Sequence, residues 1–251
     1  MEQIRIFCGG STAACRYSCD YLKRIGIQLV SAPDEGAEYL LLDIPSFQSN
    51  GALRSGGDLR TLLNPLPREM IVCGGNLSHP DLAGYETIDF LQDEEYLCRN
   101  AKITAQCALD VAMPLMGRMF YRCPVLIIGW GRIGKCLAQI LKALEAEVTV
   151  AVRDPKQKAV LLALGYRGLL ISELPEELPH FRLIYNTVPA PVLSQKDLSL
   201  CKENCVKIEL ASRDGMTGDD IVIARGLPGI HMPESSGTLI AETFLRLAKR
   251  R

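Results

Sequence analysis

The glycine-rich stretch Gly129-Trp130-Gly131-Arg132-Ile133-Gly134 constrains the fold of this 251-residue chain more than any other feature. The apolar run Val125–Ile128 precedes it, and a helical pattern of apolar residues over Arg132–Leu144 follows it. Glycines at this spacing suit a strand that turns sharply into a helix packed close against it. The β-branched run Glu147–Val152 predicts a second, parallel strand, and therefore a strand–helix–strand unit.

A turn of this kind is typical of proteins that bind a dinucleotide. Gly131 lets the pyrophosphate approach the backbone, and the N-terminus of the following helix attracts its negative charge. The alternative is a glycine-rich turn that binds no ligand. The strand and the helix on either side favour the dinucleotide, so we predict that residues 129–134 bind it.

The end of the next strand bears on which dinucleotide is bound. An NAD site usually has Asp or Glu there, to accept a hydrogen bond from the ribose 2′-hydroxyl. Here the strand runs into Arg153, and a guanidinium suits the 2′-phosphate of NADP. In the alternative interpretation Arg153 is a surface residue and Asp154 takes the usual acidic role. We predict NADP as the cofactor.

Short apolar runs alternate with helical patterns through the rest of the chain, which is typical of parallel sheets covered on both faces. The expected strands are Gln3–Cys8, Ile27–Val30, Glu38–Asp43, Ile71–Cys73, Gly168–Ile171, Leu183–Asn186 and Val206–Leu210. The expected helices are Ala13–Ile25 and Pro155–Leu164, and Ile44–Gly57, rich in Pro, Ser, Asn and Gly, is an expected loop.

Two further helices organise the chain into domains. Residues 92–121 predict a long connecting helix, kinked or interrupted at Pro114, and Ser236–Lys249 predicts an amphipathic helix. By analogy with two-domain dehydrogenases, the last helix returns to the first domain. The predicted fold is α/β, with two Rossmann-like parallel-sheet domains joined by the long helix. Residues 1–103 with 236–251 form the substrate domain, and residues 104–235 form the NADP-binding domain.

Two loops that follow strands of the second half carry further candidate site residues. Asn186-Thr187-Val188-Pro189 is expected to line the nicotinamide ribose, or else to be only a turn at a proline. Ala211 and Ser212 are expected to contact the cofactor, because strand ends face the ligand crevice in this fold. Arg213 could clamp a substrate carboxylate with two hydrogen bonds, or pair with Asp214 on the surface.

The segment before the last helix offers an anion site. Ser235-Ser236-Gly237 provides a hydroxyl N-cap and free backbone amides, although plain helix capping explains Ser235 equally well. His231 lies just upstream and is a candidate acid or base. The alternative is a partly buried histidine in a loop that only makes a hydrogen bond.

Composition excludes several classes of protein. The net charge of -1 argues against a nucleic-acid partner, and the basic residues 249–251 fit a solvated helix end. No apolar run approaches the roughly 18 residues of a membrane span, and the chain enters a strand almost at once without a secretory signal. We therefore expect a cytoplasmic protein that contacts neither membrane nor nucleic acid.

The ten cysteines do not suggest a metal site. There is no Cys-x-x-Cys pair, the closest spacings are Cys15/Cys19 and Cys201/Cys205, and none of the three histidines is near two cysteines. We expect free thiols, mostly buried as small apolar side chains, and no metal.

Taken in order, these motifs resemble those of the dipicolinate synthase A chain family. The resemblance covers about residues 104 to 249 and is loose over the first hundred residues. The residues that carry it are Gly129–Gly134, Arg153, Asn186-Thr-x-Pro189, Leu210-Ala-Ser-Arg213, Gly226-Leu-Pro-Gly-Ile230 and Pro233-x-x-x-Gly237. It implies oxidation of a dihydrodipicolinate-type ring to pyridine-2,6-dicarboxylate, with NADP as hydride acceptor. It also implies a homodimer, a small flavoprotein-like second subunit, and the mother-cell cytoplasm of a spore-forming bacterium.

A dicarboxylate substrate calls for cationic or amide groups to hold it. Arg213, the residues 235–237 and Thr104 are the candidate substrate contacts. The family has Thr-x-Glu-Gly where this chain has Thr104-Ala105-Gln106-Cys107, and Gln106 cannot act as a base. His231 stands where the family more often has an apolar residue. The segment between Arg213 and Gly226 is shorter than in the family, so part of a strand or helix could be missing.

Two other functions stay open at this point. A 2-hydroxyacid dehydrogenase pairs an arginine with a late histidine, as Arg213 and His231 do, but no carboxylate is clearly placed to assist His231. A nucleotide-binding scaffold or regulatory subunit with impaired catalysis is supported by Gln106 and by the shortened segment before Gly226.

Overall fold

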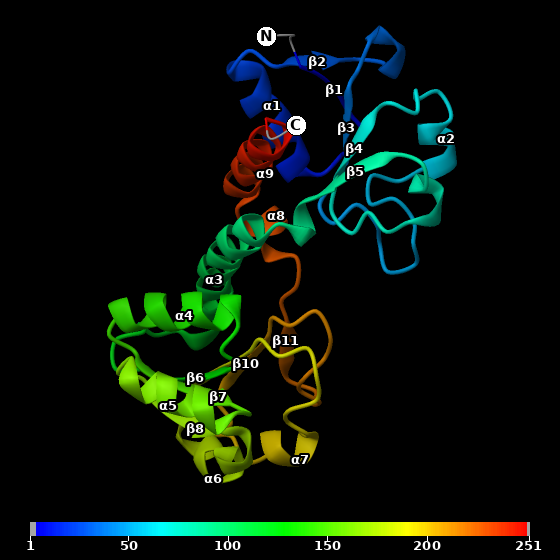
Figure 1. The fold of residues 1–251 in the computed structure, drawn as a ribbon. Helices are drawn as coiled ribbons and strands as arrows, with labels where there is room; N and C mark the ends of the chain where they lie inside the picture. The colour runs from blue at the N-terminus through cyan, green and yellow to red at the C-terminus, as the bar shows by residue number, and fades with distance from the viewer. Residues whose placement is uncertain (1–3, 250–251) are drawn as a thin grey trace. The chain divides into compact units, whose positions relative to one another are not determined.

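The computed structural model describes residues 4–249, so Gln3, the first residue of the first predicted strand, and the basic residues 250–251 lie outside the described residues. The chain forms two compact units. Unit 1 comprises Met1–Asn100 with Pro228–Arg251, and unit 2 comprises Ala101–Leu227. Each unit holds one parallel sheet with interleaved helices, which confirms the predicted α/β class of two Rossmann-like domains (Figure 1). No helix within residues 4–249 has the length and apolar character that crossing a membrane requires.

The sheet of unit 1 has the strand order β2-β1-β3-β4-β5. Its strands are β1 (Arg5–Cys8), β2 (Gln28–Val30), β3 (Tyr39–Leu41), β4 (Ile71–Gly74) and β5 (Glu86–Asp89). The strand order reverses between β1 and β3, and the chain leaves β1 through a turn into α1 (Ala13–Arg24). The sequence pattern did not predict β5, because Glu-Thr-Ile-Asp carries a single large apolar side chain.

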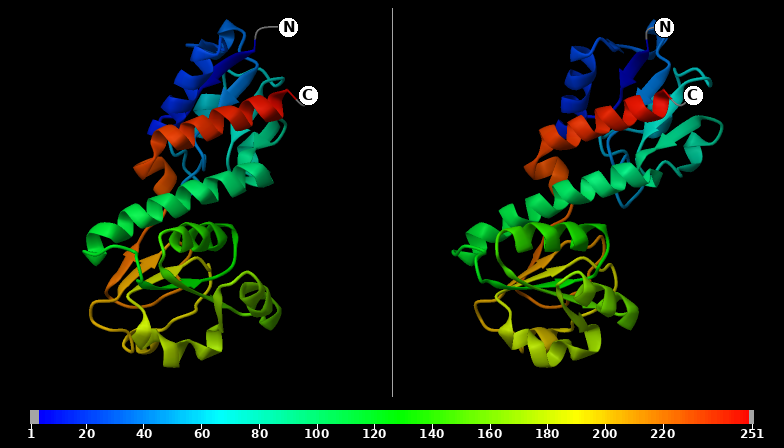
Figure 2. Two further views of the ribbon diagram at one scale, coloured as in Figure 1. Left: turned by 90° about the vertical axis from the view of Figure 1, so that its left-hand side faces the viewer. Right: turned by 60° about the vertical axis from the view of Figure 1, so that its left-hand side comes forward.

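The C-terminal helix α9 (Pro233–Ala248) packs against α1, as predicted for a helix that returns to the first domain (Figure 2). Gly237 makes this close packing possible. A Cβ atom there would lie 2.5 Å from both the Ala14 carbonyl oxygen and the Tyr17 Cβ. Further along α9, Phe244 packs edge-on against Tyr39 of β3, with ring centroids 5.1 Å apart. Helix α9 therefore packs directly against α1 and β3 of its own unit.

The long helix α3 (Glu94–Met116) begins in unit 1 and ends in unit 2. The prediction of an interruption at Pro114 is wrong, since the helix continues through this residue to Met116. It stops short of the predicted Tyr121 because Gly117 takes the left-handed conformation, with φ of 59°, that commonly ends helices. A proline within two residues of the end removes one backbone hydrogen bond and is tolerated there.

The sheet of unit 2 has the strand order β11-β10-β9-β6-β7-β8, the doubly wound order of dinucleotide-binding domains. Its strands are β6 (Pro124–Ile128), β7 (Glu147–Val152), β8 (Arg167–Leu170), β9 (Leu183–Asn186), β10 (Val206–Glu209) and β11 (Ile221–Ile223). Helices α4 (Arg132–Ala143) and α5 (Pro155–Ala163) follow β6 and β7. Strand β11 follows β10 with no helix between them, so the short segment before Gly226 holds a strand but no crossover helix.

The remaining helices are short and were not predicted. They are α2 (Leu59–Leu63), α6 (Leu174–Glu177), α7 (Gln195–Leu198) and α8 (Leu227–His231). The 3₁₀ turns are η1 (Pro33–Glu35), η2 (Pro80–Leu82), η3 (Phe90–Gln92), η4 (Ile171–Glu173) and η5 (Leu178–His180). Elements this short contain too few residues to show a helical period.

Candidate dinucleotide-binding site

Two glycines of the turn after β6 are required by packing inside the protein. Gly129 has a φ of +104°, and a Cβ there would lie 2.5 Å from Thr187 Oγ1 and 2.8 Å from Val188 Cγ2. A Cβ at Gly134 would lie 2.2 Å from the carbonyl oxygen of Gly129. Gly129 therefore allows the tight turn, and Gly134 allows α4 to lie against it.

Gly131, which lies between these two glycines, is not required by packing inside the protein. Gly131 is the N-cap of α4, with φ of -81° and ψ of -167°, a conformation open to any residue. A Cβ there would meet no protein atom within 4 Å, and the N-cap offers the first turn no side-chain hydrogen bond. A side chain at Gly131 would instead fill the space in front of the α4 N-terminus. This cradle fits the pyrophosphate of a dinucleotide.

The other predicted residues of the turn surround this cradle. Arg132 is exposed and Ile133 is half-buried in the first turn of α4. Trp130 is half-buried and packs edge-on against Tyr166, with ring centroids 5.5 Å apart. The Trp130 ring is thus held against the segment that leads into β8, so it stiffens the turn.

The loop after β9 lies beside the glycine turn, at the point where the strand order reverses. The backbone N–H of Thr187 and its hydroxyl both donate to the carbonyl oxygen of Ile128, at 3.0 and 2.8 Å. Thr187 and Val188 are half-buried, and Pro189 is exposed. The structure therefore brings the loops that follow β6 and β9 together, where this fold binds its ligands.

Asn186 takes part in this arrangement from inside the protein. It is fully buried, and its Nδ2 donates to both carboxylate oxygens of Glu209, at 2.8 and 2.9 Å, and to the carbonyl of Val188. Its Oδ1 accepts from the Val188 N–H at 3.1 Å. Both ends of the Asn186 side-chain amide are occupied by these bonds, so it shapes the loop rather than facing a ligand.

Glu209, the last residue of β10, was missed by sequence reasoning. It is fully buried and accepts hydrogen bonds from the backbone N–H groups of Ala211, Gly215 and Met216, at 3.0, 2.9 and 3.1 Å. Together with Asn186 these donors satisfy a carboxylate that burial alone would strongly disfavour. Glu209 thus ties the loop after β10 to the loop after β9. The available signal was an acidic residue near the end of the predicted strand, directly before the loop that carries other candidate site residues.

The end of β7 presents a cation. The end of β7 lies beside the end of β6, where the N–H of Gly129 donates to the carbonyl of Ala151 at 2.9 Å. Arg153 is exposed there and forms no ion pair with any residue that the structure describes. Asp154 Oδ1 instead accepts from the N–H of Lys156 at 2.8 Å and caps α5. One oxygen of the carboxylate that could bind a ribose hydroxyl is therefore engaged in capping α5.

The loop after β10 places Ser212 and Arg213 in solvent and buries Ala211. Asp214 forms its ion pair with Arg225, at 2.6 Å, and Arg225 Nε also donates to the carbonyl of Ala211. The surface pair between Arg213 and Asp214, considered from the sequence, is thus replaced by a pair with Arg225.

The predicted hydroxyl N-cap at the start of the last helix is wrong. Helix α9 starts at Pro233 with Met232 as N-cap, so Ser235 and Ser236 lie within its first turn. The N–H of Ser236 donates to the carbonyl of Met232 at 3.0 Å, and Ser236 and Gly237 are buried. The prediction failed because Pro233 opens the helix earlier than the serines suggested.

The three remaining candidates fall on helices. His231 is exposed at the last residue of α8, so the expectation of a partly buried histidine in a loop is wrong. On α3, Thr104 is buried and Gln106 is exposed. Positions two apart on a helix point to different sides, so Thr104 and Gln106 do not share a surface.

Each unit also contains a cavity. The cavity of unit 2, of about 560 Å³, is lined by Pro124, Glu147 and Arg167, the first residues of their strands. It therefore lies at the amino end of the sheet, opposite to the glycine turn. The cavity of unit 1, of about 490 Å³, is lined by Phe7, Gly9, Ser11 and Thr61, among others. It lies where β1 ends, the usual position of a ligand in this strand order.

The fold and the glycine turn define a two-domain protein with a dehydrogenase-type scaffold. Among solved structures, the chain is similar to D-lactate dehydrogenase from Escherichia coli, with a TM-score of 0.64, 14% identity, and coverage of 98% of this chain and 96% of that one. It is similar to the dipicolinate synthase A chain from Bacillus halodurans, with a TM-score of 0.83, 21% identity, and coverage of 98% and 97%. The dipicolinate synthase A chain from Bacillus subtilis also gives 0.83, with 20% identity and coverage of 100% and 97%.

In sequence, the chain is 31% identical over 131 residues to the dipicolinate synthase A chain of Bacillus subtilis (strain 168). The match covers 49% of this chain and 44% of that protein, so it spans less than half of the curated relative. No protein-family model matches the sequence. The resemblance to the dipicolinate synthase A chain family that the motifs predicted is confirmed.

Proposed function

We propose that this chain is an NADP-dependent oxidoreductase of the dipicolinate synthase A chain type. The observation that carries the proposal is Gly131, a glycine that neither backbone conformation nor internal packing requires, at the N-cap of α4. Its neighbours Gly129 and Gly134 hold the turn in place from within. The similarity to dipicolinate synthase A chains supports the same conclusion.

The residues of unit 2 divide the task of holding the cofactor. Residues 129–134 receive the pyrophosphate, Arg153 receives the 2′-phosphate, and the loops 187–189 and 211–212 border the nicotinamide ribose. Asn186 and Glu209 keep these two loops in register through their buried hydrogen bonds. When bound, NADP supplies the hydride acceptor.

The proposed reaction is oxidation of a dihydrodipicolinate-type ring to pyridine-2,6-dicarboxylate. The ring loses a hydride to the cofactor and a proton to a base, and the gain of aromaticity favours the product. Arg213, exposed after β10, is the proposed contact for a substrate carboxylate. The cavity of unit 1 at the end of β1 is a second candidate location for the substrate. Thr104, Ser236 and Gly237 are buried, and we therefore do not include them among the proposed substrate contacts.

The proposed oligomeric state, partner subunit and cellular location follow from the family resemblance. We propose a homodimer that works with a second, flavoprotein-like subunit in the mother-cell cytoplasm of a spore-forming bacterium. A scaffold role with impaired catalysis is the second candidate, because the exposed residue Gln106 replaces the family's glutamate and cannot act as a base.

Cofactor binding is tested by titrating the purified chain with NADPH and with NADH, following nucleotide fluorescence. We expect NADPH to bind at least about tenfold more tightly, and Arg153→Asp to abolish or reverse this preference. The matched control is Arg118→Asp, which changes the charge of an exposed arginine of unit 2 that precedes β6 and lies outside the proposed cofactor site. Equal affinity of the unchanged chain for both nucleotides would contradict the assignment of Arg153.

Turnover is tested by the absorbance of pyridine dicarboxylate, formed from a dihydrodipicolinate source with NADP, with and without the flavoprotein-like partner. Product formation that Arg213→Ala lowers would support the proposed reaction. Tight NADPH binding without product under either condition would favour the scaffold role. Oxidation of a 2-hydroxy acid instead would favour the dehydrogenase alternative.

A further inference from the structure

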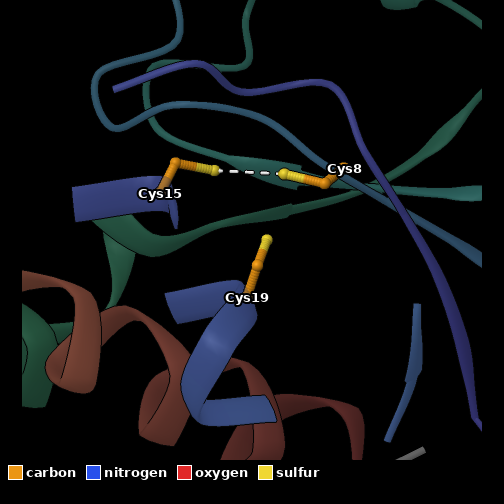
Figure 3. Close-up of side chains that lie close together, drawn as sticks. All are labelled: Cys8, Cys15 and Cys19. Carbon is orange, nitrogen blue, oxygen red and sulfur yellow. Dashed lines mark hydrogen bonds between the residues drawn. The ribbon is translucent and has the colours of Figure 1, made fainter. Parts of the chain in front are cut away.

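Three cysteine sulfurs converge where β1 meets α1 (Figure 3). Cys8 is the last residue of β1, and Cys15 and Cys19 lie one turn apart on α1. The three Sγ atoms all lie within 4.8 Å of one another, and those of Cys8 and Cys15 are 3.5 Å apart. No Cys-x-x-Cys spacing marks this cluster in the sequence, because one sulfur comes from a strand that only folding places beside the helix.

The surroundings of the cluster resemble a ligand site more than ordinary core packing. Cys15 and Cys19 are buried, with exposed fractions of 1% and 7%, whereas Cys8 is half-buried and leaves one side accessible. The Cys8 thiol also lies 3.6 Å from the carbonyl oxygen of Gly10.

Cys15 lies in the first turn of α1, where the helix dipole favours negative charge, as on a thiolate that binds a cation.

The spacing of the sulfurs suits a metal ion as well. Thiolates bound to one ion at about 2.3 Å are separated from each other by about 4 Å. This value falls between the closest separation of 3.5 Å and the limit of 4.8 Å for the cluster. Within residues 4–249, no histidine or carboxylate joins the group. Ligands that are all soft sulfurs select Cu⁺ or Zn²⁺ over harder cations.

We propose that Cys8, Cys15 and Cys19 form a three-thiolate site for a thiophilic d¹⁰ cation, Zn²⁺ or Cu⁺, which fastens α1 to β1 in unit 1. Binding of the cation displaces the S–H protons of the three cysteines, which pass to solvent, and it involves no change of oxidation state. The site is independent of the dinucleotide site of unit 2.

The test uses the full chain, reduced with a phosphine and kept free of oxygen. Zn²⁺ is titrated against a chromophoric chelator, and Cu⁺ against a Cu⁺-specific one, so that the two arms identify the preferred ion. We expect one ion per chain, with X-ray absorption giving three sulfur neighbours at about 2.3 Å. Loss of a ligand in Cys8→Ser or Cys19→Ser should lower the affinity by more than about 100-fold.

Cys98→Ser is the matched control, because Cys98 is an exposed cysteine of unit 1 outside the cluster. The metal affinity of this variant should equal that of the unchanged chain. Cys8 is the preferred variant since it is only half-buried, and circular dichroism reports whether the variant folds. Bound metal should raise the melting temperature of the unchanged chain but not of Cys8→Ser. Equal affinity of the unchanged chain and Cys8→Ser, fewer than three sulfur neighbours, or disulfide formation without metal affinity would each overturn the proposal.

Discussion

The two units contain the same structural feature, a strand that turns through glycines into a helix, but they complete it differently. In unit 1 the turn after β1 is closed by Asp43, which accepts from the N–H groups of Ser11 and Thr12, both at 3.0 Å. The Thr12 hydroxyl donates to Asp43 at 2.6 Å and accepts from the N–H of Cys15 at 3.3 Å, capping α1. In unit 2 the N-cap of α4 is Gly131, which has no side chain to donate or accept.

The difference separates two uses of one fold. Asp43 is 2% exposed and accepts from the amides of Ser11 and Thr12, which lie just before α1 and at its N-cap, so these amides of unit 1 are already satisfied. Among the residues that the structure describes, no N-cap side chain accepts from the first turn of α4 in unit 2, which leaves that turn open to an anion from outside. We infer that unit 2 is the dinucleotide-binding unit, and that a Rossmann-like strand order alone does not identify a phosphate site.

The largest expected effect concerns Gly134. Gly134→Val places a Cβ against the carbonyl of Gly129, 2.2 Å away, and cannot be accommodated without moving α4 from the sheet. We expect a loss of about 3 kcal/mol or more in the free energy of unfolding, measured in denaturant. Gly131→Val is the control, and its stability should fall by no more than about 1 kcal/mol, because valine is a poorer N-cap than glycine but meets no protein atom there. Equal stability of the two variants would mean that the glycines do not differ in role.

The next effect concerns the cofactor. Gly131→Val should lower NADPH affinity by about 100-fold, which is about 2.7 kcal/mol, because the new side chain fills the space in front of α4. The measurement is a fluorescence titration of a variant whose circular dichroism matches that of the unchanged chain. Undiminished affinity would contradict the proposed position of the pyrophosphate.

A change to the turn of unit 1 should leave the cofactor site alone. Asp43→Ala leaves the N–H groups of Ser11 and Thr12 without their acceptor, at an expected cost of about 2 kcal/mol. Hydrogen exchange at these two amides should accelerate, while NADPH affinity stays within about twofold of the original. A large drop in NADPH affinity would show that the turn of unit 1, and not only that of unit 2, takes part in cofactor binding.

The smallest expected effect separates the two interpretations of Asp154. As the N-cap of α5, Asp154→Ala should destabilise the chain by about 1 kcal/mol without changing the preference between NADPH and NADH. Thermal unfolding and paired nucleotide titrations measure the two quantities. A selective loss of NADH binding would instead assign Asp154 to the ribose hydroxyl.

Much of the fold followed from local patterns. The strands β6, β7 and β9 are mostly apolar or β-branched, and the glycine turn between β6 and α4 has a characteristic spacing, so all of them were predicted closely. Strand β5 and helices α2, α6 and α7 were missed because they are short or polar. Of the candidate site, the glycine turn and Arg153 could be predicted, since each depends on residues close in sequence.

The amino-acid sequence alone determined the alternation of strands and helices, the dinucleotide turn, and the resemblance to the dipicolinate synthase A chain family, because these depend on neighbouring residues. Tertiary structure decided the roles of Glu209 and Asp43, the burial of Gly237 against α1, and the meeting of Cys8 with Cys15 and Cys19. Each of these contacts joins segments that are distant in sequence or belong to different elements. The hydrogen-bond partners of a buried carboxylate, and the neighbours of a thiol, exist only once the sheet and its helices have assembled.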